Sequence, residues 1–216
     1  MSESQRKESI RKSRQKAVGD MLRQNTRDRL LQAAEQEFRD SGYAGTTVAA
    51  LAGAAGVSVQ TLYLAWGSTR ALLRGYMEHV IAGGSADPTT PEDAAKRFAR
   101  LEPQERLIEL AALVAEVAGR AALGWRLYRD ASAVDPEVAR DWDELQMLRH
   151  RLFSRIIGGI PSSALAESLT SKQATDTAWA IASPESHELL VHRLGYSLEE
   201  FRAWMARTLV GTMLAR

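Results

Sequence analysis

The sequence predicts an all-α fold, with a small N-terminal domain and a larger C-terminal domain that are both helical. Apolar residues recur at the spacing of an α-helix in almost every segment after residue 27. No segment alternates apolar and polar residues as a strand would, and glycine or proline separates the helical segments. The 216 residues, of which 45% are hydrophobic and 25% charged, are enough for a sizeable core.

The composition excludes several classes of protein. Without cysteine the chain forms no disulfide, thiolate metal site or iron–sulfur cluster. Its apolar runs are shorter than the ~20 residues of a membrane span, and its N-terminus lacks the apolar stretch of a secretory signal. We therefore expect a cytoplasmic protein with no membrane partner.

Basic residues gather at the N-terminus. Residues 1–29 contain nine Lys and Arg against four Asp and Glu, a net charge of +5, whereas the rest of the chain carries −4. This asymmetry predicts a basic, flexible arm over residues 1–26 that contacts a polyanion, and the alternative is a solvated tail without a partner. The candidate contact residues of the arm are Arg11, Lys12, Arg14, Lys16 and Arg23.

Four helices are predicted for the N-terminal domain, residues 27–82. Gly42 suits the C-cap of the first helix, and Ser68 suits the N-cap of the fourth. Thr47 and Ser58 suit the N-caps of the second and third helices. The predicted helices cover residues 27–41, 47–55, 58–66 and 68–81.

The larger domain is predicted over residues 91–216, after a loop of Gly, Ser, Thr and Pro at residues 83–91. Its longest helix follows Pro103 and carries apolar residues on two faces, so we expect it to be central and buried. The predicted helices of this domain cover residues 91–100, 103–128, 135–157, 162–170, 172–182, 184–194 and 197–214.

Residues 46–66 have the form of a helix-turn-helix, because two short helices are joined by a tight turn that contains glycine. Leu51 and Ala52 are expected to pack inward, and Gly56 can adopt the positive φ that the turn requires. Leu62 and Trp66 are expected to attach the second helix to the core. The alternative is an ordinary helical hairpin with no partner.

The second helix of this motif carries a mixed polar and apolar face. At about 100° per residue, Gln60 and Leu64 point most directly away from Leu62, and Thr61 and Tyr63 flank them. Such a face can contact the major groove of DNA, because glutamine bonds adenine and an apolar group meets the thymine methyl. Hydroxyl groups at the starts of the two helices suit phosphates.

These residues resemble the N-terminal domain of the TetR (tetracycline repressor) family of bacterial transcriptional regulators. The resemblance covers residues 27–73, about a fifth of the chain. It is carried by Ala33-Ala34, Phe38, Gly42-Tyr43, Thr46-Thr47-Val48, Ala55-Gly56-Val57-Ser58, Thr61-Leu62-Tyr63, Trp66, Ser68 and Leu72-Leu73. The predicted DNA-binding residues are Thr47, Ser58, Val59, Gln60, Thr61, Tyr63, Leu64 and Thr69.

Three departures from the family pattern remove basic residues. The family often has Lys after the turn serine, where this chain has Val59, and a basic or His pair where it has Leu64-Ala65. The later Ser-Lys is Ser68-Thr69 here. We therefore expect the motif alone to bind the DNA backbone weakly and the basic arm to supply the missing charge.

The resemblance also implies a mechanism. It implies a ligand-responsive repressor that binds a pseudo-palindromic operator as a homodimer formed through the last two helices, with a small-molecule effector of unknown identity. The fourth helix would couple the two domains. Individual pocket residues stay open, because each large side chain in the second domain also suits a plain core. The candidates are Trp125, Tyr128, Trp142, His150, Phe153 and Trp179.

Two other classes of protein are considered. An enzyme is not expected: the sequence has no glycine-rich phosphate loop or G-x-S-x-G, and His187 and His192 are five apart rather than the four of a zinc-protease helix. We expect no catalytic residue, metal or cofactor. A non-specific or accessory DNA-binding protein that acts through its basic arm is the main alternative, and a module that binds only proteins is a third.

Overall fold

The computed structural model describes residues 3–83 and 96–215, with side chains from residue 15 onward. The all-α prediction is confirmed: apart from one antiparallel bridge between Leu165 and Leu214, the described residues hold no β-structure. They divide into two compact units, one ending at Tyr76 and one beginning at Met77. Within these ranges no single helix has the length and apolarity to cross a membrane, although the bent pair 48–54 and 59–66 has both when taken together.

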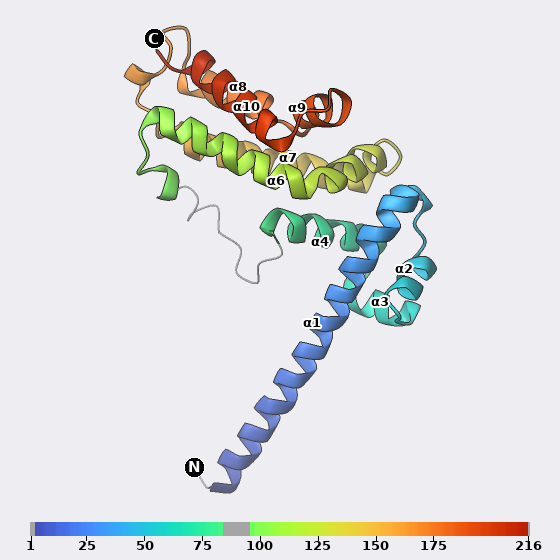
Figure 1. Cartoon of the computed structure of the whole chain (residues 1–216). Helices are drawn as coiled ribbons and strands as arrows, with labels where there is room; N and C mark the ends of the chain where they lie inside the picture. Colours follow the sequence, from blue (N-terminus) through green and yellow to red (C-terminus); the bar gives the residue numbers. More distant parts are fainter. Residues whose placement is uncertain (1–2, 84–95, 216) are drawn as a thin grey trace. The chain divides into compact units, whose positions relative to one another are not determined.

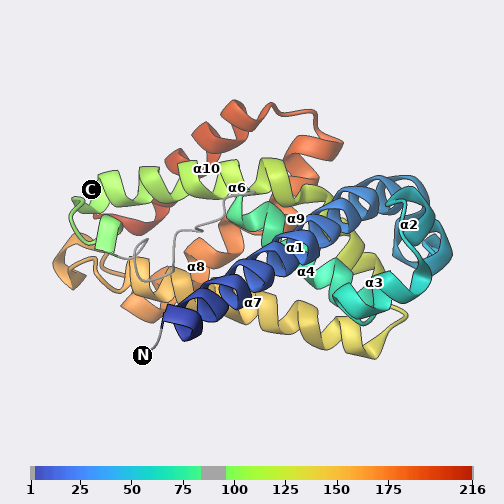
Figure 2. The same cartoon turned by 90° about the horizontal axis from the view of Figure 1, so that it is seen from below.

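The first unit is built on α1 (Glu3–Gly45), against whose C-terminal half lie α2 (Val48–Ala54) and α3 (Val59–Trp66) (Figures 1 and 2). The boundary between the units falls inside α4 (Thr69–Ala82). The rings of Phe38 and Tyr76 meet edge to face, 6.3 Å apart, and attach the first half of α4 to α1. The fully buried side chains of this unit include Leu30, Ala34, Phe38, Leu51, Leu62, Leu72 and Leu73.

The first helix begins much earlier than the sequence predicted. It is helical from Glu3, whereas a basic, flexible arm was expected over residues 1–26. The segment has no proline and only one glycine, and the Gln24 amide donates to Asp28 one turn on (2.8 Å), so nothing in it opposes a helix. The predicted end at Gly42 is confirmed, since its φ of 66° breaks the helical conformation.

The second unit is arranged around α6 (Pro103–Ser132), which packs against both α7 (Pro136–Ile157) and α10 (Leu198–Met213) (Figures 1 and 2). Helix α8 (Ser171–Ile181) packs against α7 and α10. The expected central position of α6 is confirmed by its twelve buried residues. The predicted loop at 83–91 and the start of the helix at 91–100 lie outside the described residues, apart from Gly83; residues 96–98 are helical.

Two predicted helices of this unit differ in the structure. The segment 162–170 holds only a short 3₁₀ turn, η1 (Ser162–Ala164), because its backbone pairs with the C-terminal segment instead. The amide of Ala166 donates to the Met213 carbonyl (2.9 Å), and that of Ala215 donates to Ala164 (3.0 Å). The segment 184–194 is a single α-turn, α9 (Pro184–His187), followed by a π-helix, η2 (Glu188–Arg193).

The π-helix brings together His187 and His192, which are five residues apart in the sequence. In a π-helix residues five apart lie above one another, and the rings of His187 and His192 are 5.8 Å apart. His187 is 4% exposed, with the rings of Phe201 and Trp125 at 5.4 and 6.0 Å. No group of three metal-ligating side chains occurs among the described residues.

We expect this unit to lose stability on mild acidification because of His187. Burial lowers the pKa of His187, and the neighbouring His192 lowers it further, whereas Glu188 opposes them. As the pH falls below about 6.5, His187 is protonated in the unfolded chain before it is protonated in the folded one, so the folded state loses stability. This loss continues until the folded histidine is protonated as well. Each unit of pKa difference between the two states corresponds to about 1.4 kcal/mol. Urea unfolding measures the free energy of unfolding at each pH. Between pH 7.5 and 5.5 this free energy should decrease less in His187→Gln than in the wild type. His79→Gln is the control, because His79 is exposed. If the free energy of unfolding decreased as much in His187→Gln as in the wild type, the loss of stability would not come from His187.

Candidate nucleic-acid interface

Helices α2 and α3 form a helix-turn-helix with a bend of 98°, within the ~90–120° of that motif. Gly56 takes a φ of 62° in the turn, and the Val57 amide donates to the Ala52 carbonyl (2.9 Å). Both predicted N-caps are confirmed. Thr47 Oγ1 accepts a hydrogen bond from the Ala50 amide and Ser58 Oγ from the Thr61 amide, each at 3.1 Å.

Helix α3 turns one side to the core and the other to solvent, as predicted. Leu62 is completely buried, whereas Leu64 is 82% and Tyr63 50% exposed, and Gln60 is exposed beside them. Thr61 is half-buried, and its hydroxyl shares a hydrogen bond of 2.8 Å with that of Ser58. The solvent-exposed groups on this face are therefore the amide of Gln60, the phenol of Tyr63 and the apolar side chain of Leu64.

Trp66 holds the end of α3 against two other helices. The guanidinium of Arg27 in α1 lies 4.2 Å from the centre of the indole ring. In α4 the ring lies directly over Gly75, where a Cβ atom would come within 2.1 Å of it. The sequence predicted Trp66 as a core residue but did not identify either partner.

Arg29 of α1 binds the turn itself. Its guanidinium donates hydrogen bonds to the carbonyl oxygens of Ala55 and Gly56, the latter at 3.2 Å. Two of the nine basic residues counted at the N-terminus, Arg27 and Arg29, thus have a structural contact with the motif. Sequence reasoning missed them, since nothing local relates residue 29 to a turn 26 residues later.

The family model described as bacterial regulatory proteins of the tetR family matches residues 30–76, which contain this motif and Gly75 of α4 and begin just after Arg27 and Arg29. Residues 30–76 are thus a domain of the tetR family. Transcriptional regulators of this family are generally non-enzymatic DNA-binding proteins.

Solved structures of other proteins share the fold of most of this chain. NalD of Pseudomonas aeruginosa, described as the secondary repressor of the MexAB-OprM multidrug efflux pump, is 16% identical, with a TM-score of 0.69 over 89% of this chain and 98% of NalD. A TetR family transcriptional regulator from Pseudomonas syringae pv. tomato is 19% identical, with a TM-score of 0.59 over 88% of this chain and 97% of that one. At these identities the likeness shows the fold alone. A comparison with curated protein sequences finds no match.

The remaining predicted DNA-binding residues lie in α1 and at the starts of α2, α3 and α4. Thr47 is exposed at the start of α2, and Val59, 41% exposed, begins α3. Thr69 is half-buried at the first turn of α4. In the basic segment Lys16 is exposed, and Arg23, 72% exposed, donates to Asp20. The side chains of Arg11, Lys12 and Arg14 lie outside the described residues.

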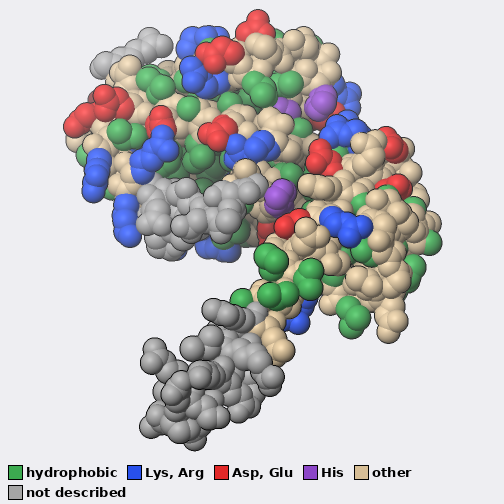
Figure 3. All heavy atoms as spheres, turned by 60° about the horizontal axis from the view of Figure 1, so that its bottom comes forward, with side chains coloured by type: hydrophobic (Ala, Val, Ile, Leu, Met, Phe, Trp, Pro, Cys, Tyr) green, Lys and Arg blue, Asp and Glu red, His purple; other side chains and the backbone are tan. Residues whose placement is uncertain are grey.

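The basic segment of α1 has two different sides. Lys16, Arg23 and Arg27 follow one another at intervals of seven and four, so they lie on one side of the helix. Arg27 contacts Trp66, which puts this basic stripe on the side of α1 that α3 occupies. Hydrophobic side chains are exposed on another side, and Figure 3 shows green side chains next to the grey turns of the helix. They are Val18, Met21 and Leu22, which are 53%, 65% and 61% exposed.

Proposed function

We propose that this tetR-family regulator is a ligand-responsive repressor that binds a pseudo-palindromic operator as a homodimer. The observation that carries the proposal is the exposed face of α3, with Gln60, Tyr63 and Leu64 at full or half exposure on a helix whose inner side is completely buried. The description of NalD as a repressor supports the direction of regulation.

The face of α3 has the chemistry for direct contact with bases. The Gln60 amide can bond the N6 and N7 positions of adenine, and the Leu64 side chain can contact a thymine methyl. The Tyr63 hydroxyl suits a phosphate oxygen, as do the hydroxyls of Thr47 and Ser58 at the helix starts. Val59, Thr61 and Thr69 complete the proposed contact surface.

The basic stripe Lys16, Arg23 and Arg27 supplies charge on the side of α1 where α3 lies. Since α3 itself has no basic residue, phosphate neutralisation falls to this stripe and to the preceding turns of α1. We propose that the helical N-terminal segment lies along the DNA backbone, with Arg11, Lys12 and Arg14 as further contacts.

We expect the double substitution Lys16→Gln/Arg23→Gln to reduce the salt dependence of DNA binding. Each lost phosphate contact lowers the log–log slope by about 0.9, and the double variant loses two contacts on each subunit of the dimer, so the slope should fall by about three to four units. Fluorescence anisotropy with duplex DNA at several salt concentrations measures the slope. Arg39→Gln is the matched control, because Arg39 is also an exposed arginine of α1, paired with Glu35 on the opposite side from the stripe. An unchanged slope in the double variant would contradict a role for the stripe.

An apolar surface in the second unit supports the proposed homodimer. Leu189 of η2, Leu194 after it and Leu198 at the start of α10 are 55%, 68% and 42% exposed, and all lie within ten residues of one another. Exposed leucines gathered in one short segment are typical of a protein interface, and a two-fold symmetric dimer would cover the same patch on both copies.

Helix α4 supports a response to a ligand, because it has contacts in both units. Its first half packs through Gly75 and Tyr76 in the N-terminal unit. Its last carbonyls, of Val80 and Ile81, accept hydrogen bonds from Arg120 of α6 at 3.0 and 3.2 Å. A change in α6 would therefore act directly on the end of α4.

The experiment that tests the proposal is selection of binding sites from random duplex DNA by the full chain at one fixed, near-physiological salt concentration. Enrichment of an inverted repeat is expected for a dimer that contacts bases. Salt-dependent retention without an enriched sequence would favour a non-specific or accessory DNA-binding protein instead. Absence of retention would contradict both.

A further inference from the structure

Two arginines of α1 contact α3 at both of its ends. Arg29 donates hydrogen bonds to the carbonyl oxygens of Ala55 and Gly56, which lie in the turn before α3. At the other end, the guanidinium of Arg27 lies 4.2 Å from the ring centre of Trp66, the last residue of α3. Two fixed ends determine the direction of a helix of only eight residues, so α3 has a defined orientation against α1 (Figure 1).

The turn before α3 has both the acceptors and the space for the guanidinium of Arg29. Among the described residues no main-chain amide donates to the carbonyl of Ala55 or Gly56, so Arg29 supplies the donor for both. Gly56 leaves room for this contact, because a Cβ atom there would come within 2.8 Å of a guanidinium nitrogen of Arg29. The glycine therefore serves the contact with α1 as well as the positive φ of the turn.

Arg29 is an exposed residue, so the alternative role for its guanidinium is a phosphate contact. Its position on α1 favours the contact with the turn. Arg29 follows Arg27 by two residues and lies about 160° around the helix from it, so it does not continue the basic stripe Lys16, Arg23 and Arg27. The stripe and Arg29 thus have different neighbours, and we expect them to have different roles.

We propose that Arg29 is a positioning residue for operator recognition, which acts through the turn and holds α3 at the angle that base contact requires. This inference deepens the proposed function and rests on it, because it concerns how Gln60 and Leu64 reach the bases. Contact groups must be held within about 0.5 Å and 10–20° of the productive geometry. Since α3 contains no basic residue, its orientation depends on its neighbours in the fold rather than on salt bridges of its own with phosphate.

Replacement of Arg29 by lysine separates the two roles. Lysine keeps the charge, but its side chain ends one bond sooner and lacks the planar guanidinium, so it does not reproduce both hydrogen bonds. For Arg29→Lys we expect the preference for the selected operator over random DNA to fall at least about fivefold, while the salt slope stays unchanged. Competition binding by the full chain measures both quantities. A lower stability alone would reduce specific and non-specific binding equally and leave their ratio unchanged.

Two further variants complete the test. Arg39→Lys is the matched control, because Arg39 is also an exposed arginine of α1 but is paired with Glu35; it should behave as the wild type does. Arg29→Gln removes the charge, and it should lose preference and keep the salt slope as Arg29→Lys does. If Arg29 contacts phosphate instead, Arg29→Lys should keep the preference and Arg29→Gln should lower the slope by about 0.9 on each subunit. That second pattern would overturn the proposal.

A measurement on the wild type depends on no variant, so it holds even if a variant misfolds. The guanidinium signals of Arg29 in ¹⁵N-resolved NMR should show restricted rotation without DNA, because the hydrogen bonds to the turn are present in the free protein. Free rotation without DNA would overturn the proposal.

The outcomes separate this inference from the proposed function. If the selection experiment enriched no sequence while the rotation of Arg29 was restricted, Arg29 would still position α3 and the proposed function would fall. If the wild type preferred an operator and Arg29→Lys kept that preference in full, the proposed function would stand and this inference would fall.

Discussion

Substitution of Gly75 by alanine is expected to displace α3 although the substituted residue lies in α4. A Cβ atom at this position would come within 2.1 and 2.3 Å of two ring carbons of Trp66, far inside van der Waals contact. The ring cannot turn freely, since Arg27 stacks on it. Overpacking of this kind costs about 1–3 kcal/mol. We therefore expect faster amide hydrogen exchange over residues 59–66 and a lower free energy of unfolding of the N-terminal unit.

Gly53→Ala provides the control for this prediction. Gly53 is also a helical glycine of the N-terminal unit, but a Cβ atom there would have no neighbour within 4 Å. Alanine is the better helix former by about 1 kcal/mol, so Gly53→Ala should leave the stability unchanged or raise it. If Gly75→Ala behaved in the same way, the contact between α4 and the indole ring would be refuted.

The helix-turn-helix could be predicted from sequence because its determinants are local. Thr47 and Ser58 cap helices that begin one residue later, and Gly56 supplies the positive φ of the turn next to them. Leu62 and Leu64 lie on opposite sides of α3 simply because they are two residues apart in a helix. The early start of α1 was not predicted, because a highly charged segment is typical both of a flexible arm and of an exposed helix, and only the absence of proline favours the helix.

Contacts between distant segments could not be predicted from one sequence. Arg29 was counted as part of a basic segment, yet it donates to the carbonyls of Ala55 and Gly56. Arg120 likewise contacts Val80, 40 residues earlier, with no local signal. An arginine that binds backbone carbonyls needs no complementary side chain, so no pattern of residue types marks its target.

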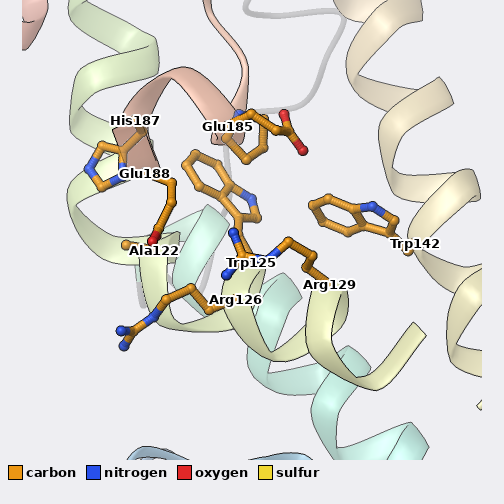
Figure 4. Close-up of a pocket in the computed structure, with 9 residues that line it drawn as sticks. Ala122, Trp125, Arg126, Arg129, Trp142, Glu185, His187 and Glu188 are labelled. Carbon is orange, nitrogen blue, oxygen red and sulfur yellow. The ribbon is translucent and has the colours of Figure 1, made fainter. Parts of the chain in front are cut away.

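Size alone also did not distinguish pocket residues from core residues in the second unit. Of the six aromatic candidates, Trp125 and Trp142 line a small pocket between α6, α7 and the α9–η2 segment (Figure 4), and Tyr128 is buried and stacks on Trp142. The others serve packing: Phe153 is in the core, and His150 meets the edge of Trp179 while it bonds Asp176 (2.9 Å). His187 was not a candidate, because its position depends on the π-helix, which no feature of the sequence predicted.

The largest effect on DNA recognition is expected from Gln60→Ala combined with Tyr63→Ala. Both side chains are exposed, so the free energy of unfolding should change by less than about 0.5 kcal/mol. Loss of a bidentate contact with a base costs about 1–3 kcal/mol, and a dimer loses it twice, so preference for the selected operator over random DNA should fall by more than tenfold. Competition binding at constant salt measures this preference, and Gln32→Ala, an exposed glutamine of α1, serves as the control. Non-specific binding and its salt slope should persist, because they depend on Lys16 and Arg23 instead. Undiminished preference in the double variant would mean that bases are contacted by another part of the chain than α3.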